Sequence, residues 1–118
     1  MDPETFFDGR PEALAVYRAV RGMIDGIGPT EVRVSCSQVA FRRRRSFAYL
    51  WLPGRWLRKP GAEVVLSIAL GRLVVGTRFK QVAHPSPSIW MHHLEIHRLE
   101  DVDADVLGWL REAYDDAA

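Results

Sequence analysis

The sequence has a single cysteine, Cys36, among its 118 residues. One thiol cannot form an intramolecular disulfide or a thiolate metal site, so the sequence predicts a protein of a reducing compartment. Long apolar runs are absent as well, since no stretch approaches the roughly 18 residues that a membrane helix needs. Charged residues interrupt the first twelve positions, where a secretory signal would need an apolar segment. We therefore expect a cytoplasmic protein that neither crosses nor contacts a membrane.

The length and composition are those of one ordinary globular domain. A chain of 118 residues has no room for a second core of normal size, which excludes an enzyme with a separate cofactor-binding lobe. With 47% hydrophobic and 26% charged residues, the composition also excludes a disordered chain or a coiled coil. We therefore expect a single domain over residues 1–118 and no cofactor.

Basic and acidic residues nearly cancel, to a net charge of +1, but they are unevenly distributed. Residues 1–31 carry a net charge of −3, residues 32–98 of +10 and residues 99–118 of −6. A basic centre of this kind can attract an anionic partner even when the whole chain is nearly neutral. The same distribution arises when acidic helices lie beside a basic sheet and neutralise it within the fold, so both interpretations stay open.

Hydrophobic periodicity predicts a helix near each end of the chain. Residues 11–27 repeat apolar side chains at the helical period, Pro11 suits a first turn, and a Gly-Pro pair ends the segment. Asp101 and Asp103 are candidate N-caps of a closing helix whose apolar face begins at Val106.

Between these helices the period changes to two. Val32 and Val34 alternate with Arg33 and Ser35, and strands are predicted at residues 39–43, 47–52, 64–70 and 91–98. Residues 73–80 are a candidate for a further short strand. The segment His84-Pro85-Ser86-Pro87 is expected to be an extended loop, because each proline biases the preceding residue away from the helical region. We therefore predict an α+β fold: an N-terminal helix, an antiparallel meander of four to five strands and a C-terminal helix, with both helices on one face of the sheet.

The hairpin of residues 39–43 and 47–52 places two sets of side chains on opposite faces of the sheet. If the loop at Arg44 and Arg45 has even length, the apolar set suits the face that the helices cover. The opposite face then carries Gln38, Arg42, Phe47, Tyr49 and Trp51. Aromatic rings beside a guanidinium and an amide are typical of recognition surfaces, so these five residues are the predicted ligand-binding site.

Three interpretations of this aromatic face stay open. The loops at residues 53–63 and 71–90 could pack their own apolar side chains over it. Two copies of the chain could meet through it in a homodimer. A small ligand, a protein partner or nucleic-acid bases could bind on the rings, with the neighbouring arginines holding charge.

Four consecutive basic residues occupy the predicted hairpin tip, namely Arg42, Arg43, Arg44 and Arg45. Basic residues between aromatic ones are typical of nucleic-acid binding, so this run is a candidate polyanion site. Arg55, Arg58 and Lys59 follow the opposite end of the same hairpin, about 20 Å away for six strand residues, which suits an extended polyanion. A charged hairpin tip also discourages aggregation at strand edges, and this structural interpretation competes with the functional one.

His93, Glu95 and His97 alternate along the last predicted strand and so share one face. Two imidazoles and a carboxylate could supply a facial set of metal ligands in a metal-dependent enzyme. Neighbours on one strand face are about 7 Å apart, so the side chains would have to converge, and a hydrogen-bonded polar face is the alternative. His92 points to the opposite, core-facing side, where a structural hydrogen bond is expected.

Several segments carry a family resemblance: residues 34–41 (VSCSQVAF), 47–48 (FA), 51–53 (WLP), 90–95 (WMHHLE) and 109–114 (WLREAY). Together they resemble a bacterial family of small domains, domain of unknown function 5655, over nearly the whole chain. The resemblance implies an intracellular α+β domain that stands alone or is appended to others. It implies a lysine at the position of Cys36, where this chain departs, and it implies no reaction and no catalytic residues.

The sequence therefore predicts a non-enzymatic binding or interaction module more strongly than any particular reaction. Neither a glycine-rich phosphate loop nor a serine in a nucleophile elbow is found. The expected partner is an unidentified small ligand or protein at the aromatic face, with a homodimer as a variant. Nucleic-acid binding at the arginine run and metal-dependent catalysis at His93, Glu95 and His97 are the alternatives.

Overall fold

The amphipathic segment at residues 11–27 forms helix α1 (Pro11–Ile27) in the computed structural model, which describes residues 2–58 and 61–118. Pro11 occupies the first turn, where the missing amide hydrogen has no intrahelical partner to lose. Val20 and Ile24 lie on the buried face of the helix. The helix ends at Ile27, and the amide of the following Gly28 donates to the Ile24 carbonyl.

The closing helix α2 (Ala104–Asp116) begins at one of its two predicted caps. The Asp103 carboxylate accepts a hydrogen bond from the Val106 amide at 3.2 Å. Asp101 instead belongs to the short 3₁₀ helix η3 (Leu99–Asp101) and accepts from the His97 amide at 2.9 Å. A side-chain cap of this kind satisfies an amide that the helix itself leaves unpaired.

Across the described part of the chain the sheet has six strands, not the four to five predicted. They are β1 (Glu31–Val34), β2 (Val39–Arg42), β3 (Ser46–Trp51), β4 (Val64–Leu70), β5 (Phe79–Ser86) and β6 (Ile89–Ile96). All neighbours are antiparallel, in the order β1-β2-β3-β4-β6-β5. The prediction of a simple meander is therefore wrong in one respect, because β4 pairs with β6 and the intervening β5 lies at the edge.

Strand β5 also corrects the predictions for residues 73–80 and for the proline-containing segment at residues 84–87. The strand predicted at residues 73–80 begins only at Phe79, and it continues through His84 and Pro85, where a loop was expected. Pro85 is tolerated because β5 is an edge strand and the pairing with β6 is interrupted between Ala83 and Ser86. A proline at an edge or a bulge removes no ladder hydrogen bond that the sheet needs.

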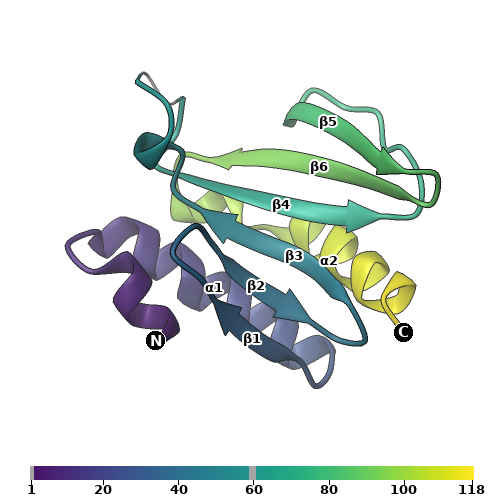
Figure 1. The fold of residues 1–118 in the computed structure, drawn as a ribbon, viewed down its shortest axis with the longest axis horizontal. Helices are drawn as coiled ribbons and strands as arrows, with labels where there is room; N and C mark the ends of the chain where they lie inside the picture. The colour runs from purple at the N-terminus through teal and green to yellow at the C-terminus, as the bar shows by residue number, and fades with distance from the viewer. Residues whose placement is uncertain (1, 59–60) are drawn as a thin grey trace.

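Both α-helices cover the same face of the sheet, as predicted (Figure 1). Leu50 of β3, Leu66 of β4 and Leu94 of β6 are buried there against helix residues such as Val20 and Leu110. Fully burying one such side chain contributes roughly 1.5–3 kcal/mol, so this layer stabilises the fold substantially. No helix within the described residues lies over the opposite face, which is called the outer face below.

Phe47 does not lie on the outer face, which corrects its predicted position. The pairing of β2 with β3 shifts between Phe41 and Arg42, so that Arg42 opposes Ser46 instead of Phe47. A β-bulge of this kind places two successive side chains on similar sides of the strand. Phe47 consequently joins Ala48 in the core and is only 1% exposed.

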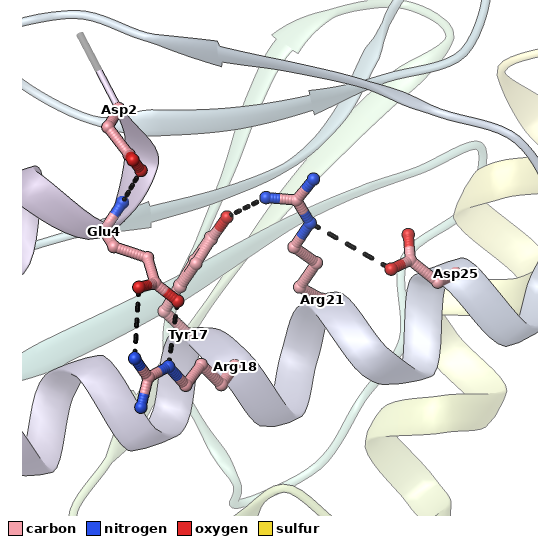
Figure 2. A network of polar contacts seen from close by, with 6 residues as sticks. All are labelled: Asp2, Glu4, Tyr17, Arg18, Arg21 and Asp25. Carbon is pink, nitrogen blue, oxygen red and sulfur yellow. Dashed lines mark hydrogen bonds and ion pairs between the residues drawn. The ribbon is translucent and has the colours of Figure 1, made fainter.

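The N-terminal segment is fastened to α1 by polar contacts, which Figure 2 shows. Glu4, in the 3₁₀ helix η1 (Pro3–Phe7), forms a two-pronged ion pair with Arg18 at 2.9 and 3.0 Å. Farther along α1, Arg21 donates to the Tyr17 hydroxyl at 2.6 Å. The buried Phe7 stacks on Tyr17 with ring centroids 5.3 Å apart, so η1 extends the core layer.

No helix in the described part of the chain has both the length and the apolar character needed to cross a membrane.

Candidate functional site

The outer face carries a pocket of about 480 Å³. Its walls and floor come from β3, β4, β6, the turn before β2 and the segment after the 3₁₀ helix η2 (Pro53–Arg55). The lining residues are Ser37, Gln38, Tyr49, Trp51, Trp56, Ser67, Met91 and His93. Segments far apart in the sequence thus meet at one concave site.

Strand register explains why these side chains meet. Tyr49 of β3 pairs with Ser67 of β4, and Ser67 pairs with His93 of β6. Residues directly opposite each other on neighbouring antiparallel strands project to the same face with their Cβ atoms about 5 Å apart. The three side chains therefore form a row across the outer face, and Trp51, two residues after Tyr49, joins the same face.

The pocket has a hydrogen-bonded polar floor. The indole Nε1–H of Trp51 donates to the Ser67 hydroxyl oxygen at 2.9 Å. The same hydroxyl lies 2.7 Å from Nδ1 of His93. Ser67 is only 3% exposed, so these two contacts satisfy a hydroxyl that burial would otherwise leave unpaired at a substantial cost.

Burial lowers the pKa of His93 below its ordinary value, and the neighbouring His92 lowers it further. The imidazole is therefore neutral at pH 7. His92 faces the helix side, where its Nε2 accepts from the Val74 amide at 3.0 Å. Burial lowers the pKa of His92 as well. The two adjacent histidines thus serve opposite faces of the sheet, as their alternation predicts.

Aromatic side chains form the walls. Trp56 is 61% exposed and stands at the rim, while Tyr49 and Trp51 are half-buried. The guanidinium of Arg55 donates to the Cys36 carbonyl at 3.0 Å and to the Phe6 carbonyl at 3.3 Å. Arg55 therefore ties the segment that carries Trp56 to the turn that carries Ser37 and Gln38.

Of the five residues predicted to bind a ligand, three line the pocket and two do not. Gln38, Tyr49 and Trp51 are among its lining residues, whereas Phe47 is in the core. Arg42 pairs with Glu31 and Ser46 toward the end of the sheet and does not line the pocket.

Sequence reasoning did not assign Ser37, Trp56, Ser67 or Met91 to the ligand site. It considered His93 as a metal ligand, as part of a hydrogen-bonded polar face and as a neighbour of the aromatic site. Ser67 had a recognisable signal, because it is the single polar residue in the apolar strand Val64–Leu70. A hydroxyl in such a strand needs a partner, but the identity of that partner depends on which strands are neighbours. Met91 had no comparable signal.

The arginine run at the β2–β3 hairpin is partly engaged by the end of α2. Arg43 donates to the Tyr114 carbonyl at 3.1 Å, and its guanidinium lies 4.1 Å from the centre of the Tyr114 ring. The amide of Arg44 donates to the Ala117 carbonyl at 3.1 Å. A cation near the last carbonyls of a helix interacts favourably with its dipole, so part of this run has a structural role.

Of the further basic residues that an extended polyanion would contact, Arg55 is the last residue of η2 and Arg58 follows it. Arg55 is used in the contacts described above, and Arg58 is exposed. Lys59 lies outside the described residues.

The three predicted metal ligands do not converge. His93 is bound to Ser67, while Glu95 lies 3.8 Å from His97 and 3.4 Å from Lys80. Within residues 2–58 and 61–118, no group of three His, Cys, Asp or Glu side chains is arranged to hold a metal ion. A lysine beside the carboxylate further disfavours a cation there.

Comparison with known proteins places this fold in a family. The family model described as Domain of unknown function (DUF5655) matches residues 4–117. The chain belongs to this family. The match confirms the resemblance noted in the sequence and includes every strand and every pocket residue. No curated protein and no solved structure matches the chain.

Proposed function

We propose that this domain is a non-enzymatic binding module whose ligand site is the outer-face pocket. The observation that carries the proposal is a concave space of about 480 Å³, walled by three aromatic side chains above a polar floor in which Trp51, Ser67 and His93 are linked by hydrogen bonds. Ligand pockets commonly have volumes of roughly 300–1,000 Å³ and combine apolar walls with a few convergent polar groups. The outer-face pocket meets both criteria.

The composition of the pocket supports a role in binding more than a role in packing. Trp56 exposes 61% of its surface at the rim, although tryptophan is a residue that folding usually buries. Ser67 and His93 introduce polar groups into a sheet that apolar residues would fill more simply. Among the described residues of the segments 53–63 and 71–90, Trp56 alone lines the pocket.

The Ser67–His93 contact favours binding over nucleophilic catalysis. Ser67 is 3% exposed, and its oxygen already accepts the Trp51 indole hydrogen bond. A nucleophilic serine needs an accessible oxygen and a base that is itself oriented by a third group. No such third group is bonded to Nε2 of His93 among the described residues.

A phosphate-rich partner is less compatible with this site. Phosphate binding relies on arginine, lysine or clustered amide donors, and none of the described pocket residues is basic apart from the neutral His93. The nearest arginine run is directed toward α2 through Arg43. We therefore rank nucleic-acid binding below small-ligand binding.

The proposal can be tested by titrating the ¹⁵N-labelled protein with a library of small aromatic fragments. We expect the indole N–H signals of Trp51 and Trp56 to shift, and the Trp109 signal, from the helix side of the sheet, to remain in place. The Trp56→Ala variant should bind the same fragments more weakly. Leu73→Ala is the matched control, because Leu73 is also a half-exposed apolar residue but lies outside the pocket.

Two results would contradict the proposal. One is that no fragment shifts the Trp51 and Trp56 signals. The other is a stable homodimer in sedimentation experiments whose interface protects the same two indoles, which would make the outer face a self-association surface.

A further inference from the structure

We infer that the ligand of the outer-face pocket is an uncharged aromatic ring system with a hydrogen-bond acceptor, and that this acceptor receives the Nε2–H of His93. This inference rests on the proposed function and specifies its ligand. It follows from three features of the pocket: the charge of its lining, the position of one proton, and the chemistry of its walls.

The pocket lining carries no formal charge. The described residues around it are serine, glutamine, tyrosine, tryptophan, methionine and histidine, although 26% of the chain is charged. A charged ligand buried in such a site would lose its hydration without gaining an ion pair. The lining therefore selects an uncharged ligand.

The hydrogen bonds of the floor determine where the His93 proton lies. The indole nitrogen of Trp51 is only a donor, so Ser67 must be the acceptor in their contact. The hydroxyl proton of the buried Ser67 then has one acceptor within reach among the described residues, Nδ1 of His93 at 2.7 Å. A neutral imidazole that accepts at Nδ1 carries its proton at Nε2. Burial keeps His93 in this neutral form by lowering its pKa.

The Nε2–H group of His93 is the unused donor of this chain of hydrogen bonds. It has no partner among the described residues, and no described buried side-chain nitrogen or oxygen lacks a partner. Nε2 is therefore accessible to solvent, and the open space that His93 lines is the outer-face pocket. A carbonyl oxygen or a ring nitrogen of the ligand would complete the chain from Trp51 through Ser67 and His93.

The walls select a flat ring. Tyr49, Trp51 and Trp56 present aromatic surfaces, and Met91 adds a polarizable sulfur. Stacking of a planar ring on aromatic side chains contributes binding without requiring charge, and the volume of about 480 Å³ accommodates a ring system larger than a single six-membered ring.

Three probes of nearly equal shape test the inference: 2-naphthamide, 2-naphthoate and 2-isopropenylnaphthalene. The first is uncharged with an acceptor, the second is charged, and the third has neither charge nor acceptor. We expect 2-naphthamide to bind with a Kd about threefold to tenfold lower than either of the others, as measured from the Trp51 and Trp56 indole signals. Equal affinities, or tighter binding of 2-naphthoate, would overturn the inference.

Two substitutions of His93 separate its two nitrogens. His93→Asn retains an acceptor near Nδ1 for Ser67 but removes the donor at the Nε2 position, whereas His93→Gln places an amide donor near Nε2. We expect His93→Asn to abolish the preference for 2-naphthamide over 2-isopropenylnaphthalene, and His93→Gln to retain part of it. An unchanged preference in folded His93→Asn would overturn the assignment.

The outcomes distinguish this inference from the proposed function. If all three probes bind the wild-type pocket without discrimination, the binding site stands and the ligand class is wrong. If neither these probes nor any library fragment shifts the Trp51 and Trp56 signals, both proposals are wrong. The wild-type series decides the ligand class even if a His93 variant fails to fold.

Discussion

The ring of Phe47 meets the ring of Tyr114 edge-on, with centroids 5.7 Å apart and planes at 90°. The contact joins β3 to α2 and lies on the helix side of the sheet, although Tyr49, two residues later, lines the outer-face pocket. Strict alternation would place both rings on one face. The bulge at the start of β3 therefore divides the aromatic residues of this strand between the core and the site.

Phe47→Ala should destabilise the fold by about 3–5 kcal/mol, because it leaves a cavity in a core where Phe47 is 1% exposed. Tyr49→Ala should cost much less, since Tyr49 is only half-buried in an open pocket. Chemical denaturation of both variants measures the difference. Similar losses of stability in the two variants would show that the two rings do not occupy different faces.

Gly28→Ala should destabilise the protein by about 1–3 kcal/mol through overpacking. A Cβ atom at Gly28 would collide with the phenol of Tyr114, whose hydroxyl donates to the Pro29 carbonyl at 3.2 Å. Gly22→Ala is the matched control, because its Cβ would meet open space within α1 and should stabilise the helix by about 0.5–1 kcal/mol. In thermal unfolding, we expect a lower Tm for Gly28→Ala and a higher Tm for Gly22→Ala. A lower Tm for both variants would contradict this explanation.

Arg43→Ala should lower the free energy of unfolding by about 0.5–1.5 kcal/mol, because it removes the hydrogen bond to the Tyr114 carbonyl and the cation–π contact with its ring. Arg45→Ala changes the net charge equally, but the Arg45 side chain is exposed and has no polar partner among the described residues. Arg45→Ala should therefore leave the free energy of unfolding nearly unchanged, as measured by chemical denaturation of both variants. Equal losses of stability in the two variants would mean that the charge at the hairpin tip matters and that the contacts of Arg43 with Tyr114 do not.

The stability of the fold should decrease as the pH falls below about 6.5. Burial lowers the pKa of His92 and of His93 in the folded state, so the unfolded chain takes up these protons first. The two histidines therefore make their full contribution to the free energy of unfolding above about pH 6.5, the pKa of histidine in the unfolded chain. That contribution declines as the pH falls toward their lower pKa values in the folded protein. Urea denaturation at pH 7.5, 6.5 and 5.5 measures this slope. His93→Asn should reduce it, and a slope that is zero or reversed in the wild type would contradict the prediction.

The local sequence pattern predicts correctly those elements that depend on residues only a few positions apart. The apolar repeat and its Pro and Gly boundaries predicted α1 with the bounds it has, Pro11–Ile27. Asp103 was identified as a cap because a carboxylate can reach the amide three residues later within one turn. Alternation likewise assigned Tyr49 and Trp51 to the face opposite Leu50.

The same local rules failed where two distant segments decide the outcome. Phe47 turns inward because β3 gains a residue relative to β2 and because Tyr114 offers it an aromatic partner. Pro85 continues a strand because β5 pairs only with β6 and lies at the sheet edge.

The sequence by itself determined that the chain folds as an α+β domain with an aromatic strand, since hydrophobic period and caps act over single turns or residue pairs. Only the tertiary structure decided that β4 lies beside β6, and with it the contact of Ser67 with His93 on which the pocket floor depends. The physical reason is that strand order depends on how all segments bury their apolar faces together, and no local pattern records that arrangement.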